Sequence, residues 1–179
     1  MTDVERLLAI EEIKQLKARY FRCMDTKDWD GFEAVFAPDV AFDLREGIFA
    51  RDPVSGVILR SGDIQVEEGS IGNDWVQVGA ANVRAFEERV LTGVITVHHG
   101  HMPEIEVTSA TTAQGLWAME DILRFPLKAA NPLISWLPEG AAFKELHGFG
   151  IYHETYERID GRWLIKTLRL RRLRVDIVG

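Results

Sequence analysis

Residues 146–175, LHGFGIYHETYERIDGRWLIKTLRLRRLRV, contain the clearest fold signal in the chain. Two segments of this stretch, at about 146–158 and 162–175, have the pattern expected of β-strands. Between them, Asp160-Gly161 is a residue pair that tight hairpin turns favour. We therefore expect two neighbouring antiparallel strands in this part of the chain.

Two further segments upstream, at about 94–107 and 112–125, show the same strand pattern. They extend the prediction to an antiparallel meander of four strands. A shorter run at 40–44 predicts one more strand, whereas residues 46–78 show no clear period. Residues 127–144 combine prolines and glycines with apolar side chains, and we interpret them as a lid over a pocket.

The N-terminal part of the chain has a helical pattern instead. Thr2 and Glu5 have the spacing of a capping box, and apolar residues then recur every three or four positions to about Asp25. Two shorter helices are predicted further on, from Asp28 to Pro38 and from Gly79 to Leu91. Helices followed by long antiparallel strands predict an α+β fold, in which a curved sheet wraps against the helices.

The composition is that of an ordinary globular protein, with 46% apolar and 27% charged residues among 179. This length suits a single domain over residues 1–179. The net charge of −7 disfavours nucleic acid as a partner, because it repels phosphate backbones. A lone cysteine, Cys23, excludes an internal disulfide, and no stretch has the pattern of a signal peptide or a membrane span. We expect a cytoplasmic protein that has no membrane partner.

Three of the five histidines lie together in His98-His99-Gly100-His101. Strand alternation puts His99 and His101 on one face and His98 on the other. Either face could supply a catalytic base, His99 and His101 could share a metal ion, or the cluster is structural. The spacing from Gly93 onward approximates the first metal motif of cupins. The second cupin motif is missing, so we predict no metal site.

Two aspartates are candidate partners for such a base. Asp25 falls where the first helix ends, and the negative end of the helix dipole is expected to raise its pKa. Alternatively, Asp25 or Asp28 only caps the next helix. Asp121 points into a largely apolar strand face, where a carboxylate needs a partner. A histidine or tyrosine opposite Asp121 would indicate catalysis, while an arginine would indicate a structural ion pair and a bulge would indicate exposure to solvent.

The last predicted strand contains an arginine-rich run, LRLRRLR, at 168–174. Alternation along this strand places Arg172 on an apolar face. The guanidinium of a buried arginine must meet a carboxylate or an anionic ligand, so Arg172 is a candidate for the site. Alternatively, the whole run forms a solvated edge or a subunit interface.

Four motifs carry a resemblance to a known family. They are KARYFRCMD at 17–25, HHGHMPEI at 98–105, GLWAMED at 115–121 and YERIDGRW at 156–163. In order and spacing they resemble the SnoaL-like family of the nuclear-transport-factor-2-like superfamily, most of all its bile-acid dehydratases and more distantly scytalone dehydratase. The likeness covers nearly the whole chain. It implies a cone-shaped α+β barrel, with N-terminal helices packed against a strongly curved, mostly antiparallel sheet.

The resemblance also implies which residues form the site. The implied catalytic residues are Tyr20, Asp25, His98 and Asp121, and Arg172 completes the implied set as a substrate contact. Trp117, Met119 and His101 are further candidate substrate contacts. The resemblance thus selects His98 as the base, whereas alternation groups His99 and His101 with the apolar positions of the strand. A β-bulge near Gly100 would reconcile the two, because one extra residue exchanges the faces of a strand.

The implied activity is that of a cofactor-independent dehydratase, a hydro-lyase acting on a hydroxylated carbonyl compound of steroid, polyketide or aromatic type. His98 would abstract a proton next to the carbonyl, while Tyr20 assists the leaving hydroxyl or polarises the carbonyl. An isomerase or a cyclase would begin with the same proton abstraction. A non-catalytic ligand-binding module or an oxygenase-type partner subunit is the alternative from another class. We expect a small-molecule substrate, no cofactor, and a homo-oligomer that is a trimer or a dimer.

Overall fold

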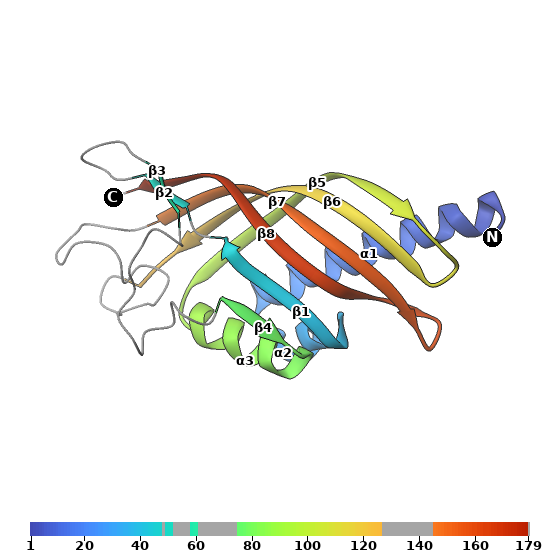
Figure 1. Ribbon diagram of the computed structural model, residues 1–179. Coiled ribbons are helices and arrows are strands. Elements are labelled where there is room, and N and C mark those ends of the chain that lie inside the picture. The colour runs from blue at the N-terminus through green and yellow to red at the C-terminus, as the bar shows by residue number, and fades with distance from the viewer. Residues whose placement is uncertain (48, 52–57, 61–74, 127–144, 179) are drawn as a thin grey trace.

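The computed structural model describes residues 1–47, 49–51, 58–60, 75–126 and 145–178. Figure 1 follows the helices and strands within these ranges. The helices are α1 (Asp3–Thr26), α2 (Trp29–Glu33) and α3 (Ala80–Leu91). The strands are β1 (Phe36–Glu46), β2 (Phe49–Arg51), β3 (Ile58–Arg60), β4 (Val76–Val78), β5 (Ile95–Val107), β6 (Thr112–Arg124), β7 (Glu145–Ile159) and β8 (Arg162–Val178). Within these ranges, no helix combines the length and the hydropathy that crossing a bilayer requires.

The long N-terminal helix α1 begins and ends close to its predicted bounds. The Thr2 side chain accepts a hydrogen bond from the Glu5 amide, and the Glu5 carboxylate accepts one from the Thr2 amide, which completes the predicted capping box. The helix ends at Thr26, after which Lys27 takes the left-handed conformation with φ of 59°. Asp28 then caps α2 by accepting a hydrogen bond from the Gly31 amide. This confirms one of the two alternatives predicted for the cap of this helix.

The second helix is shorter than the sequence predicts. α2 ends at Glu33 instead of continuing to Pro38. The reason is tertiary, because Phe36 already pairs with Ile165 of β8 as the first residue of β1. Pro38 therefore lies within a strand, at a place where the register of β1 against β8 shifts. Such an irregularity tolerates a residue that has no N–H to donate.

Six strands form one sheet in the order β4-β1-β8-β7-β6-β5, and β2 pairs with β3 separately. Neighbours in the large sheet are antiparallel, except for β1 and β8, which run parallel. The predicted meander from β5 to β8 is confirmed. Its last hairpin turns at Asp160-Gly161, whose φ angles of 49° and 79° are both positive, as a tight turn of type I′ requires.

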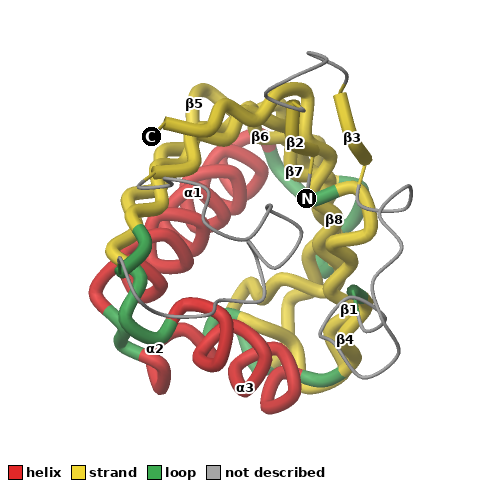
Figure 2. Tube along the Cα trace, turned by 90° about the vertical axis from the view of Figure 1, so that its left-hand side faces the viewer, coloured by secondary structure: helices red, strands yellow, loops and turns green. Residues whose placement is uncertain are grey.

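The helices and the curved sheet surround a common interior, which Figure 2 shows from one end. The inner side of α1 buries Ile13, Leu16 and Tyr20 in an apolar core that also includes Ile165 and Leu168 of β8. The fold is therefore α+β, as predicted, with N-terminal helices packed against a six-stranded, mostly antiparallel sheet. This arrangement is consistent with the cone-shaped barrel that the family resemblance implied.

Candidate functional site

A cavity that is partly open to solvent lies between the helices and the inner side of the sheet. Apolar side chains form most of its wall, among them Met24, Phe42, Leu44, Phe86, Leu123 and Leu170. The polar side chains on the wall are Tyr20, Glu87, His98, Asp121, Tyr152 and Arg172. An apolar enclosure with a few converging polar groups is the usual form of a small-molecule site. The predicted lid at 127–144 lies outside the described residues.

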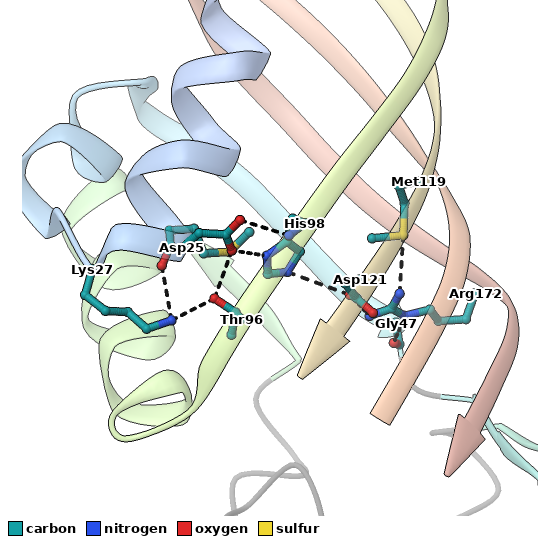
Figure 3. Close-up of polar contacts among 9 residues, drawn as sticks. Asp25, Lys27, Gly47, Thr96, His98, Met119, Asp121 and Arg172 are labelled. Carbon is teal, nitrogen blue, oxygen red and sulfur yellow. Dashed lines mark hydrogen bonds and ion pairs between the residues drawn. The ribbon is translucent and has the colours of Figure 1, made fainter. Parts of the chain in front are cut away.

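The last turn of α1 places Asp25 beside His98 of β5 (Figure 3). One Asp25 oxygen accepts the backbone N–H of His98 at 2.9 Å, and the other lies 2.6 Å from His98 Nδ1. Thr96 Oγ1 donates a further hydrogen bond to this carboxylate at 2.9 Å. Because an ionised carboxylate can only accept, the proton of a neutral His98 ring belongs on Nδ1. In this neutral tautomer, His98 Nε2 carries the lone pair.

Asp25 is more acidic than its place in the helix predicts. Burial raises the pKa of this carboxyl, but the hydrogen bonds and charge interaction with His98, together with the hydrogen bond from Thr96, hold the pKa below its usual value. The prediction of a raised pKa is therefore wrong, because it considered α1 alone and not the strand that packs against it. Asp25 is an anion that orients His98 rather than a proton acceptor in its own right.

Asp121 of β6 lies beyond His98 and is 2% exposed. His98 Nε2 is 3.7 Å from Asp121 Oδ2, which is longer than a hydrogen bond. Arg172 of β8 forms an ion pair with the same Asp121 oxygen and donates its Nε–H to the Gly47 carbonyl at 2.9 Å. The other Asp121 oxygen, Oδ1, is buried and accepts no hydrogen bond from any described residue. Asp121 thus has both partners that the sequence left as alternatives, a histidine and an arginine.

A glycine opposite Asp121 makes room for this ion pair. The pairing of β6 with β7 sets Gly148 directly beside Asp121. A Cβ atom on Gly148 would overlap both the Asp121 carboxylate and the Arg172 guanidinium. Glycine within a strand often marks such a close approach. The absence of a side chain at Gly148 therefore makes the Asp121–Arg172 ion pair possible.

A β-bulge in β5 decides which histidine faces the interior. The pairing of β5 with β6 shifts by one residue between Gly100 and Pro103. Before the shift, Thr96 is buried and the His98 side chain is only 6% exposed, whereas beyond it Val107 is buried instead. The predicted bulge is therefore confirmed. It explains why strict alternation grouped the wrong histidines with the apolar face.

His99 and His101 lie on the solvent side of β5. Both are exposed, and His99 Nδ1 is 3.3 Å from Glu120 Oε1 on the neighbouring strand. Neither is among the described residues that line the cavity, so the structure does not bring His101 to the other candidate substrate contacts. Across the described ranges, no three His, Cys, Asp or Glu side chains are arranged to hold a metal ion.

Met119 and Trp117, the remaining candidate substrate contacts, differ in their positions. The Met119 sulfur lies 3.3 Å from Arg172 Nη1 and so borders the buried ion pair. Trp117 is also buried, but its Nε1–H donates to the Tyr156 hydroxyl at 2.7 Å, and that hydroxyl donates to Glu154. Trp117 therefore belongs to a separate buried polar network, and the described cavity wall includes neither Trp117 nor Met119.

Two tyrosines meet at the cavity wall. Tyr20 of α1 and Tyr152 of β7 lie edge to face with ring centroids 6.0 Å apart, and their hydroxyl groups interact. Burial is the main cause that raises the pKa of each hydroxyl above its usual value. Such hydroxyls stay protonated and are suited to donating hydrogen bonds rather than releasing protons. Tyr152 is not among the residues predicted from the sequence, although the alternation of β7 puts it on the buried face.

Glu87 of α3 is a second residue of the cavity that was not predicted from the sequence. This residue is 6% exposed, lines the cavity, and shares the buried helix face with Val83 and Val90. Burial raises its pKa to about 7, against the opposing charge of Lys27 and with a contribution from Asp121. The signal was present in the sequence, because Glu87 interrupts the apolar side of the predicted helix at 79–91.

Comparison with known proteins agrees with this architecture. A family model described as a SnoaL-like domain matches residues 5–169. A "probable cyclase" from Gibberella zeae is 26% identical over 167 residues, which cover 90% of this chain and 89% of that protein.

Two solved structures illustrate the fold. A "putative scytalone dehydratase" from Novosphingobium aromaticivorans has a TM-score of 0.70 at 17% identity and covers 99% of this chain and 93% of its own. A hexachlorocyclohexane dehydrochlorinase, LinA type 3 from Novosphingobium barchaimii, has a TM-score of 0.68 at 15% identity, with coverage of 99% and 95%. At such identities the structural matches show the fold alone. The finer resemblance to bile-acid dehydratases does not come from these comparisons.

Proposed function

Because the chain belongs to the SnoaL-like domain family, we propose that it is an enzyme that eliminates water from a hydroxylated carbonyl compound without a cofactor. The observation that carries this proposal is the Asp25–His98 pair, in which Asp25 contacts Nδ1 of a ring that lines an apolar cavity. An imidazole oriented by a carboxylate is a competent general base near neutral pH. The dehydratase and the dehydrochlorinase that share the fold bear the names of elimination reactions, which supports this reaction class.

Proton abstraction begins the proposed reaction. His98 Nε2 takes a proton from the carbon next to the carbonyl, and the Asp25 carboxylate stabilises the resulting imidazolium. The electron pair of the broken C–H bond moves onto the carbonyl oxygen, where Tyr20 donates a hydrogen bond to the developing enolate. The carbonyl then re-forms as the C–O bond of the neighbouring carbon breaks. The departing oxygen leaves with a proton as water.

The cavity wall supports a substrate with an apolar body, of steroid, polyketide or aromatic type. A bile acid or its coenzyme A thioester is one member of this class. Arg172 faces the cavity, but Asp121 and Gly47 already engage two of its nitrogens. We therefore propose that Arg172 acts on the substrate mainly by holding Asp121 in place.

A cyclase or an isomerase is the second candidate. The relative from Gibberella zeae is described as a probable cyclase, and ring closure or a double-bond shift can begin with the same proton abstraction. The mass of the product separates the dehydratase from the other two reactions, because only the dehydratase releases water. A ligand-binding module differs from all three, since it would use the cavity without needing His98 as a base.

The test compares the wild type with His98→Ala and Asp25→Asn. Hydroxy-carbonyl compounds, including steroid and aromatic acids and their coenzyme A thioesters, are first screened for binding by thermal shift. Each ligand is then incubated with enzyme in deuterated water and analysed by mass spectrometry. We expect a product lighter by one water from the wild type, and a loss of at least about a hundredfold in rate in both variants.

The other outcomes separate the alternatives. A product with the mass of the substrate would favour the isomerase or cyclase. Ligands that bind both the wild type and His98→Ala without turnover would favour the binding module. Full turnover by His98→Ala would overturn the proposed mechanism.

A further inference from the structure

The reaction proposed above needs an acid as well as a base, and no residue of the sequence-derived site is well suited to that role. Resting on the proposed function, we infer that Glu87 is this acid: its carboxyl group, presented to the cavity by α3, donates the proton with which the leaving hydroxyl departs as water. Glu87 lines the same cavity as His98 and Asp121.

The position of Glu87 is unusual for a glutamate. It lies within α3, away from either helix end, on the face that buries Val83, Phe86 and Val90. Among the described residues, no hydrogen bond or ion pair engages its carboxyl group. By contrast, the next residue, Glu88, faces solvent and lies 3.8 Å from Arg84 Nε. Burying a carboxyl group lowers stability, which a role toward a ligand in the cavity would explain.

The surroundings of Glu87 favour its protonated form. Burial is the largest effect and raises the pKa to about 7, the ammonium group of Lys27 at the end of α1 opposes it, and Asp121 of β6 adds to it. The other titratable groups on the cavity wall are Tyr20 of α1, His98 of β5, Tyr152 of β7 and Arg172 of β8. A carboxyl group with this pKa is about half protonated at neutral pH and is largely in its acid form below it. It also releases a proton far more readily than Tyr20, whose pKa is raised well above its usual value.

The pKa values of the Asp25 and Glu87 carboxyl groups are therefore shifted in opposite directions, downward for Asp25 and upward for Glu87. Asp25 is held as an anion by His98, whereas Glu87 is held as a neutral acid by its burial. Titratable groups whose environments push their pKa values apart mark the acid and base assignments of an active site. The anion supports the base, and the neutral carboxyl supplies the acid.

The proton transfers balance over one turnover. The C–H bond breaks, its proton goes to His98 Nε2, and its electron pair becomes the new C=C bond. The C–O bond breaks with its electron pair on oxygen, which takes the Glu87 proton and leaves as water. His98 is then protonated and Glu87 ionised. Loss of the His98 proton to solvent and uptake of one by Glu87 restore the starting state.

The experiment measures the two halves of the reaction separately. The probe is a hydroxy-carbonyl compound that the wild type converts, and the readouts are deuterium exchange at the carbon next to the carbonyl and loss of water. Glu87→Gln keeps the shape of the side chain but has no acidic proton to give. We expect it to retain exchange while losing water elimination by at least about a hundredfold, and Glu87→Asp to recover part of that loss. Glu88→Gln is the matched control and should match the wild type in both readouts.

These readouts keep the two proposals distinguishable. Unimpaired water loss in Glu87→Gln would overturn the assignment of Glu87 and leave the His98 mechanism standing. Unimpaired exchange in His98→Ala would overturn the mechanism itself. A second measurement, carbon-13 NMR, needs no substrate. The carboxyl carbon resonance of Glu87 is identified as the one that is present in the wild type and missing from Glu87→Gln. We expect this resonance to titrate near pH 7. Titration in the usual range of glutamate would overturn the inference.

Discussion

Asp25 and His98 meet twice: the carboxylate accepts the backbone N–H of His98 at 2.9 Å and contacts its ring Nδ1 at 2.6 Å. The first contact holds the strand against the end of α1, and the second sets which ring nitrogen carries the proton. The same carboxylate therefore contributes to the packing of helix on sheet and to the chemistry of the cavity.

Replacing Asp25 with asparagine should disable the base while keeping the fold. The carboxylate accepts from two groups of His98, the backbone N–H and the ring Nδ1–H. An amide has only one oxygen, so its NH₂ group must face one of these two donors. Where the NH₂ group faces Nδ1, a neutral ring avoids the clash only by moving its proton to Nε2. We expect kcat to fall by at least about a hundredfold, with a circular dichroism spectrum like that of the wild type. A kcat close to the wild-type value would show that the tautomer of His98 does not limit the reaction.

Replacing Asp121 with alanine should destabilise the protein strongly. The change leaves the Arg172 guanidinium buried without its counter-ion, which costs about 3–5 kcal/mol of unfolding free energy. The double variant Asp121→Leu/Arg172→Met should recover most of this loss, because it removes both charges. Urea denaturation measures these differences, and Glu88→Ala provides the control for an exposed pair. An Asp121→Ala cost as small as that control would contradict the assignment of a buried ion pair.

Glu87 should make stability depend on pH in a definite direction. Its pKa in the folded protein, about 7, lies above the ordinary value of 4.5, so the folded state binds this proton more tightly than the unfolded chain. The stabilisation is complete below about pH 4.5 and is lost as the pH rises to about 7. The unfolding free energy of the wild type relative to Glu87→Gln should thus fall by up to about 3 kcal/mol across this range.

Urea denaturation of the two proteins at several pH values makes this measurement. The lowered pKa of Asp25 acts in the opposite sense, because its stabilisation is lost as the pH falls. Asp25 is present in both proteins, so its effect cancels in the comparison. A difference that does not change with pH would mean that Glu87 titrates normally.

The outward side of the sheet should bind a second copy of the chain. Val97, Leu116, Ile122 and Leu173 are large apolar side chains that are 38% to 57% exposed on β5, β6 and β8. Val97 and Ile122 are paired across β5 and β6, and exposed apolar surface of this kind can mark an association site. We expect a dimer or trimer in sedimentation velocity, and a shift toward monomer in Leu116→Lys. A wild-type protein that sediments as a monomer at high concentration would contradict this expectation.

Several features of the fold and site could be predicted because they depend on local pattern. The capping box of Thr2 and Glu5 and the turn at Asp160-Gly161 involve residues close in the chain, whose backbone preferences are nearly independent of context. The inward orientation of Asp121 follows from strand alternation, and its need for a partner follows from burial. The bulge near Gly100 was predicted only by weighing the family resemblance against that alternation.

The sequence by itself thus determined the long first helix, the meander and part of the set of residues that meet in the cavity. Only the tertiary structure decided that α2 ends before Phe36. It also decided that the pKa of Asp25 is lowered instead of raised, and that the pKa of Glu87 is raised to about 7. The physical reason is the same in each case. A strand pairing or a pKa depends on which groups from distant segments displace water from a residue, and no local pattern specifies those neighbours.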